Sequence, residues 1–140
     1  MSRAKAEAPG RTRAQAEVTV DRHESEPFDD QSAPALVELK LWERFTGDIE
    51  AESTVRALQL GDARGAVRQV SLQRVIGTLC GREGTFVLQG KGTVEKGAIA
   101  STWFVVPGSG TGDLAGLRGE GGFEGKFGQG STATLDFWFE

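Results

Sequence analysis

The chain has 140 residues and a net charge of −4, from 16 basic and 20 acidic side chains. This length suits one domain, and the acidic balance argues against a nucleic-acid binder, which needs a basic surface. The 20 glycines are about twice the number expected from average usage of about 7%. Because glycine weakens helices, this composition excludes a helix-rich protein and predicts many tight turns.

Short runs of alternating apolar and polar residues, separated by glycine-containing turns, begin near residue 14. A period of two is typical of half-buried strands. We expect strands at residues 15–22, 36–45, 49–59, 66–80, 85–89, 99–106, 114–123 and 132–139. We expect loops or turns at residues 23–33, 61–65, 81–84 and 107–112.

The connections between these segments are too short for crossover helices, so the strands must be antiparallel. The sequence therefore predicts an all-β fold, a closed antiparallel barrel of about eight strands over residues 13–140. Residues 1–12 show no apolar periodicity and are expected to form a disordered tail. A short helix over residues 3–8 is the alternative.

Side-chain parity sorts the two faces of each strand. The positions expected to point inward are Val37, Leu39, Leu41, Phe45, Phe86, Leu88, Leu135, Phe137 and Phe139. The segment 66–80 carries apolar residues on both faces, so parity leaves its inward face open. Trp42 and Trp138 fall on polar faces, and exposed tryptophans favour protein contacts, so we expect a homo-oligomer.

One cysteine, Cys80, allows no internal disulfide, which favours a reducing compartment, and we expect the cytoplasm. No apolar stretch has membrane-spanning length. His23 is the single histidine, and one histidine with one cysteine cannot supply the usual ligands of zinc, so no metal site is predicted. We expect His23 to be a loop residue without a role; a catalytic histidine is the alternative. The Gly110–Ala115 segment matches the dinucleotide fingerprint, but the glycines that follow exclude the helix this motif needs. We therefore predict no cofactor.

Polar residues among the inward positions are the candidate site. Glu43 shares parity with Leu41 and Phe45, so desolvation would raise its pKa and suit it to acid–base work; the alternative is a strand-end or bulge position that turns it to water. Gln69 and Gln73 are the other candidate catalytic groups, since they could stabilise developing charge. The expected binding residues are Ser71, Ser101, Trp103, Phe45, Phe86, Leu88 and Leu41. The alternative for the glutamines and serines is an internal polar network satisfied by water.

Three segments resemble the DUF3224 family of bacterial proteins: residues 73–89, residues 105–119 with Val-Val-Pro-Gly-Ser-Gly-Thr-Gly, and the earlier block Phe-Thr-Gly-Asp-Ile at residues 45–49. The resemblance extends over about residues 15–140. It implies a barrel of the allene oxide cyclase or calycin kind, with an apolar cavity that works without a cofactor. The family pattern has Glu in place of Gln73 and His in place of Gly90, so no catalytic residue is carried over.

Two functions stay open at this point. One is a cofactor-free cyclase or isomerase of natural-product biosynthesis, which holds an apolar, polyketide-like or oxylipin-like molecule in a reactive conformation. The other is a carrier or sensor that binds a hydrophobic small molecule without transforming it. Both require a hollow barrel interior.

Overall fold

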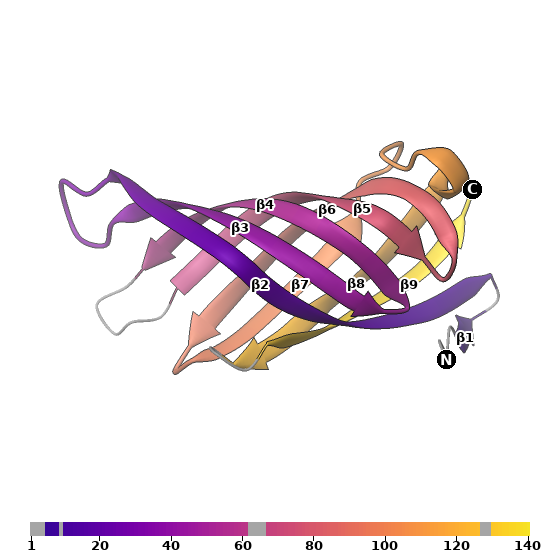
Figure 1. Ribbon diagram of the computed structural model, residues 1–140. Coiled ribbons are helices and arrows are strands. Elements are labelled where there is room, and N and C mark those ends of the chain that lie inside the picture. Colours follow the sequence, from indigo (N-terminus) through magenta and orange to yellow (C-terminus); the bar gives the residue numbers. More distant parts are fainter. Residues whose placement is uncertain (1–4, 9, 62–66, 127–129) are drawn as a thin grey trace.

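A computed structural model gives the structure of the protein, and it describes residues 5–8, 10–61, 67–126 and 130–140 (Figure 1). Within these ranges the chain is almost entirely strand. The strands are β1 (Lys5–Ala8), β2 (Arg11–Asp29), β3 (Leu36–Gly47), β4 (Ile49–Gly61), β5 (Val67–Leu79), β6 (Arg82–Glu95), β7 (Ala98–Val105), β8 (Leu117–Lys126) and β9 (Ser131–Phe139). One short 3-10 helix, η1 (Gly112–Leu114), lies between β7 and β8.

Strands β2 to β9 form one sheet in sequence order, with every neighbouring pair antiparallel. The sheet closes because β2 also pairs with β9, from Thr12 opposite Phe137 to Val18 opposite Ser131. Strand β1 lies outside this ring and pairs with the first residues of β2. The prediction of an all-β, closed antiparallel barrel of about eight strands is confirmed.

Strand β2 is much longer than predicted, because residues 23–29 continue the strand instead of forming a loop. Beyond Val18, the described part of β2 pairs only with β3. Proline is tolerated in a strand with one free edge, so Pro27 does not end the strand and pairs with Val37. The resulting β2–β3 hairpin protrudes from one end of the barrel (Figure 1).

The prediction for residues 1–12 meets the structure only in part. The structure describes Lys5–Ala8 as strand β1 and begins β2 at Arg11, whereas residues 1–4 and 9 lie outside the described residues. Residues 62–65 of the predicted turn at 61–65 also lie outside them. Strand β6 runs on past the predicted residue 89 to Glu95, through Gly90 and Gly92. The predicted strand ended too early because these glycines interrupt the alternation of apolar and polar residues.

The inward face of β5 is the one with Val67, Gln69, Gln73, Val75 and Leu79, which answers the question that parity left open. The opposite face of β5 is exposed. On β3 the odd-numbered residues point inward, as predicted.

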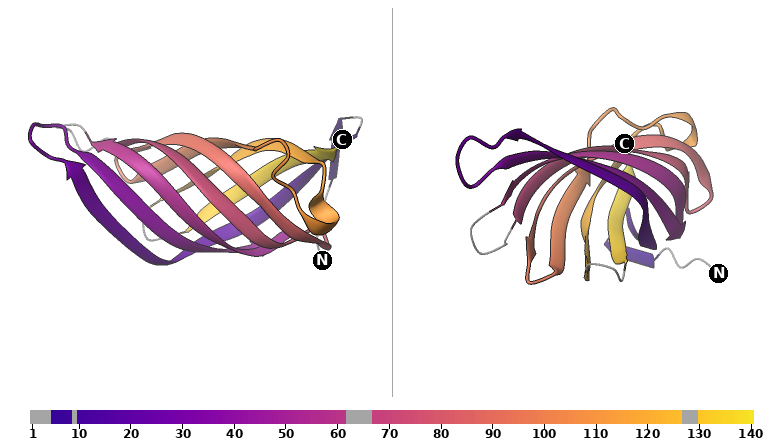
Figure 2. Two further views of the ribbon diagram at one scale, coloured as in Figure 1. Left: turned by 90° about the horizontal axis from the view of Figure 1, so that it is seen from above. Right: turned by 60° about the vertical axis from the view of Figure 1, so that its left-hand side comes forward.

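One end of the barrel is filled by a close-packed apolar core. Its buried members include Phe45, Ile49, Val75, Leu79, Phe86, Leu88, Val105, Leu117, Leu135 and Phe137. The segment from Val106 to Gly116 covers this end (Figure 2): Leu114 is fully buried, and Thr111 donates its backbone N–H to the carbonyl oxygen of Thr85 at 2.9 Å. The opposite end carries the β4–β5, β6–β7 and β8–β9 connections, and we call it the mouth.

Neither outer tryptophan lies open to solvent. The Arg22 guanidinium carbon lies 4.6 Å from the ring centroid of Trp42, and that of Arg11 lies 4.1 Å from the ring centroid of Trp138. Stacking of a cation on an aromatic face is favourable. These contacts partly cover both rings within one copy of the chain.

The part of the chain that the structure describes contains no helix long and apolar enough to cross a lipid bilayer.

Candidate functional site

A cavity of about 670 Å³ occupies the half of the barrel nearest the mouth. It has the size typical of small-molecule sites. Its lining comes from strands far apart in sequence, because the closed sheet brings β3 face to face with β7 and β8. The lining residues are Val18, Thr19, Val20, His23, Ser25, Val37, Leu39, Leu41, Glu43, Gln59, Gln69, Val94, Ile99, Phe123, Lys126, Gly130 and Ser131.

Strand β3 supplies the most continuous wall of the cavity. Val37, Leu39, Leu41 and Glu43 alternate along it on the inward face and are half-buried. Two residues further on, Phe45 is fully buried in the core. Glu43 therefore lies at the floor of the cavity, where the hollow half of the barrel meets the filled half.

A stack of aromatic rings forms another part of the floor. Phe123 faces the cavity, with its ring centroid 5.2 Å from that of Trp103, which lies 6.2 Å from that of Phe45. The indole Nε1 of Trp103 donates a hydrogen bond to the carbonyl oxygen of Thr134 at 3.0 Å. A buried indole needs such an acceptor, and this bond fixes the ring beneath Phe123.

Glycines on β6 make room inside the barrel. A Cβ atom at Gly92 would lie 2.0 Å from Oγ of Ser101, and one at Gly90 would lie 2.9 Å from Oγ of Ser71. Side chains at these two positions would displace the serines. Ser71 and Ser101 are thus held against a bare stretch of β6.

Glu43 is hydrogen-bonded from behind by an amide. Nε2 of Gln73 donates to Oε1 of Glu43 at 3.2 Å and to Oγ of Ser53 at 2.9 Å. Gln73 and Ser53 are both buried, and they come from β5 and β4. The register explains the contact, since Ser53 pairs directly with Glu43 on one side and with Val75 on the other.

Burial raises the pKa of Glu43 from 4.5 to about 7, and the hydrogen bond from Gln73 offsets part of this effect. The apolar surroundings disfavour the charged form. At neutral pH the protonated and ionised forms are therefore both well populated, which is the condition that acid–base chemistry requires.

A second polar pair lies higher on the same wall. Nε2 of Gln59 donates to Oε1 of Gln69 at 2.8 Å, and both side chains line the cavity. Val55 and Ala57 lie between this pair and Ser53 along β4. A bound molecule would thus meet polar groups at two depths, separated by an apolar stretch.

A β-bulge brings His23 to the cavity. Val20 pairs with Glu43, and the register shifts before Arg22 pairs with Trp42, leaving Asp21 as the extra residue. A bulge reverses side-chain parity, so both Val20 and His23 face the cavity. His23 therefore lies on strand β2 and lines the cavity, so the prediction that it belongs to a loop was wrong. Lys126 lies at the rim of the same cavity.

The structure places the predicted site residues in three groups. Glu43, Gln69 and Leu41 line the cavity, and Gln73 supports Glu43 from behind. Phe45, Phe86 and Leu88 pack in the filled half, because their positions along the strands lie closer to the closed end, and Trp103 supports the floor. Ser71 and Ser101 are half-buried on the inward face and do not line this cavity.

Sequence reasoning missed Val20, His23, Val94 and Phe123 as lining residues. Parity could have found Phe123, which shares its inward face with Leu117. No signal in the sequence marks the bulge at Asp21.

Comparison with known proteins gives one family and a close structural likeness. Residues 14–137 match the family model DUF3224, described as a protein of unknown function. The chain is also similar to a crystal structure of a DUF3224 family protein of unknown function from Shewanella oneidensis MR-1, with 30% identity and a TM-score of 0.79. That likeness covers 93% of this chain and 98% of the other. No match was found among curated proteins. The chain belongs to the DUF3224 family.

Proposed function

We propose that the protein binds an apolar small molecule in the cavity and catalyses a cofactor-independent isomerisation or cyclisation, with Glu43 transferring the proton. The observation that carries this proposal is the carboxyl of Glu43 on the floor of an apolar cavity, with a pKa of about 7. A carboxyl without such a role would be less costly on the outer surface, because burial disfavours its charged form.

The chemistry needs only groups that the barrel supplies. In an isomerisation, ionised Glu43 takes a proton from a carbon next to the carbonyl of the bound molecule. The electron pair moves onto the carbonyl oxygen as a dienolate forms, and protonated Glu43 returns the proton two carbons further along, so the double bond shifts. The Gln73 amide holds the carboxyl in place through both steps.

An epoxide of the kind implied by the resemblance to allene oxide cyclase would use the same carboxyl in the opposite order. Protonated Glu43 would donate to the epoxide oxygen as its C–O bond breaks, and would recover a proton once the ring has closed. The apolar walls on β3 would hold the flexible chain in a folded conformation, which supplies part of the rate.

A carrier is the second candidate, and one observation favours it. Among the lining residues only Glu43, His23 and Lys126 are ionisable, and the last two lie toward the mouth. A site with one ionisable group at its floor can bind and release a ligand as Glu43 changes charge. Turnover is what separates the two candidates.

Proton exchange tests the proposal without knowledge of the natural substrate. A panel of apolar β,γ-unsaturated ketones is incubated with the protein in D2O, and deuterium uptake and double-bond migration are followed by NMR. We expect exchange with the native chain and a loss of about 100-fold or more in Glu43→Gln, which keeps the side-chain size. Glu52→Gln, on the exposed face of β4, is the matched control and should behave like the native chain.

Binding of the same ketones is measured in parallel by calorimetry. Equal binding with equally slow exchange in both proteins would remove the catalytic proposal and leave the carrier. Absence of binding for every ketone would remove both candidates.

A further inference from the structure

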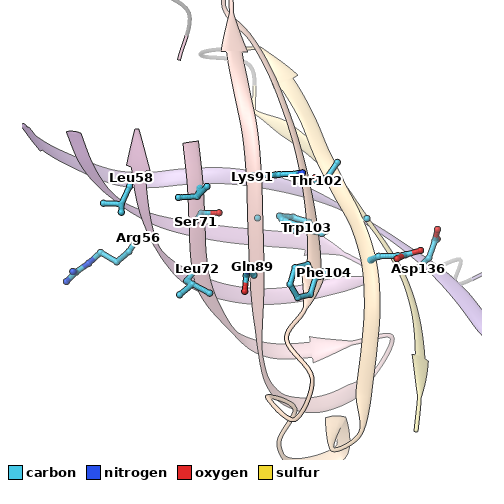
Figure 3. A pocket seen from close by; sticks show the side chains of 14 residues that line it. Arg56, Leu58, Ser71, Leu72, Gln89, Lys91, Thr102, Trp103, Phe104 and Asp136 are labelled. Atoms are coloured by element: carbon cyan, nitrogen blue, oxygen red, sulfur yellow. The ribbon is translucent and has the colours of Figure 1, made fainter. Parts of the chain in front are cut away.

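The outer face of the barrel over β4, β5 and β7 carries an exposed apolar patch. Leu58, Val70 and Leu72 are each more than half exposed, and Phe104 is 42% exposed. They border an open hollow of about 1140 Å³ on this face (Figure 3). Leu58, Val70 and Leu72 are neighbours on β4 and β5, whereas Gln89 and Lys91 on β6 lie between them and Phe104. Exposed apolar patches next to polar residues mark contact sites. We call this surface the β4–β8 face.

One row of residues across the strands of this face is symmetric in residue type about its central member, except that the charges at its two ends have opposite signs. The strand registers place Arg56, Leu72, Gln89, Phe104 and Glu120 side by side on five successive strands. From one end the row is cation, apolar, amide, apolar, anion. From the other end it is the same with the charges exchanged.

We propose that the β4–β8 face binds a second copy of the chain, around a two-fold axis that runs along β6 above Gln89. Such an axis brings each end of the row over the opposite end of the partner's row. Arg56 then faces the partner's Glu120, Leu72 faces the partner's Phe104, and the two Gln89 amides meet at the axis. Lys91, the next outward residue of β6, also lies at the axis, and repulsion from the partner's Lys91 opposes the other contacts. Self-complementarity of one patch is what an isologous dimer requires.

Arg56 and Glu120, the charged ends of the row, are exposed enough to form ion pairs with a second copy of the chain. Arg56 pairs with Glu38 at 3.0 Å and Glu120 pairs with Arg11 at 3.0 Å, but the side chains of Arg56 and Glu120 stay 59% and 61% exposed. Surface ion pairs of this kind hold their partners weakly. Both groups can therefore also contact a facing chain.

Other surfaces of the described chain fit a second copy less well. Trp42 and Trp138, the sequence-based candidates for an oligomer contact, are covered by Arg22 and Arg11. The free edge of β2 carries Pro27 and several carboxylates, which repel an identical edge.

Light scattering of the full chain tests the proposal first. We expect twice the 14.9 kDa mass of one chain at tens of micromolar, and the mass of one chain for Phe104→Ser. Phe28→Ser is the matched control, since Phe28 is also exposed but lies on the β2–β3 hairpin. Circular dichroism verifies that each variant is folded. A native chain of single mass, or equal dissociation of both variants, would overturn the proposal.

A charge exchange tests the arrangement itself. Arg56→Glu alone and Glu120→Arg alone each place like charges opposite one another in their own dimers, so each should weaken association by about tenfold or more. A 1:1 mixture restores opposite charges at both contacts and should regain the native mass. Failure of the mixture to associate better than its components would rule out the two-fold pairing of this row.

Discussion

Replacing Glu43 by glutamine should stabilise the fold, and the gain should grow with pH. The pKa of this carboxyl is about 7 in the folded chain and 4.5 at its ordinary value. Ionisation is therefore less favourable in the folded state. Glutamine keeps an oxygen that can accept the hydrogen bond from Gln73 and removes the ionisation.

The magnitude follows from the difference between the two pKa values. Each pKa unit corresponds to about 1.4 kcal/mol, so the free energy of unfolding of the native chain should fall by up to about 3 kcal/mol between pH 4.5 and pH 8 because of this group. The carboxyl borders the cavity, and water in the cavity reduces the cost of ionising it. The value of about 3 kcal/mol is therefore an upper limit for the loss of unfolding free energy. Below pH 4.5 the carboxyl is protonated in both states and the effect vanishes.

The assay is urea unfolding of native and Glu43→Gln proteins at pH 4.5, 6, 7 and 8. We expect similar stabilities at pH 4.5 and a widening difference up to pH 8, with the variant more stable. Glu52→Gln, on the exposed face of β4, should show no such trend. A Glu43→Gln difference that is constant with pH, or that shrinks as pH rises, would refute the reasoning.

Three further predictions concern the cavity and its surroundings. Gly92→Ala should lower the free energy of unfolding by about 1–3 kcal/mol, because the new Cβ would lie 2.0 Å from Oγ of Ser101. Gly61→Ala is the control: its Cβ would meet no atom within 4 Å, so it should be nearly neutral in the same urea titration. Leu39→Trp should fill the cavity and weaken calorimetric ligand binding about tenfold or more with little change in melting temperature; unchanged affinity would contradict the placement of the ligand beside β3. With the outer tryptophans replaced by phenylalanine, a ligand should change the fluorescence of Trp103 through Phe123, and a constant signal at saturating ligand would count against contact with the floor.

The architecture was predictable because its strands follow simple alternation. Leu39, Leu41 and Phe45 share one parity, as do Phe86 and Leu88, and these residues do point inward. The short connections then left only antiparallel neighbours. A closed barrel is the arrangement that pairs both edges of such a sheet.

The extent of individual strands was less predictable, for two physical reasons. The second half of β2 is polar and contains Pro27, yet it holds its place by pairing with β3 alone. Strand β6 continues through Gly90 and Gly92, where interior room is needed for Ser71 and Ser101. In both cases the strand is held by pairing with its neighbouring strands, which its own residue pattern does not reveal.

The candidate site was predictable at Glu43 and only partly elsewhere. The inward direction of the Glu43 side chain follows from strand parity. Its burial follows from its place on β3, two residues before the fully buried Phe45. The depth of a residue along the barrel axis depends on the stagger between strands, which the sequence does not specify. Phe45 and Phe86 therefore pack in the filled half, while His23 faces the cavity because the bulge at Asp21 reverses the parity of the residues after it.

A methyl NMR titration tests most directly whether the hollow half of the barrel is a binding site. The leucine, valine and isoleucine methyl groups are labelled, and an apolar unsaturated ketone is added to saturation. Saturable shifts are expected at Leu39, Leu41 and Val94, which line the cavity, and not at Leu79 or Leu117 in the filled half. Shifts confined to the outer Leu58 and Leu72, or none at all, would contradict the account.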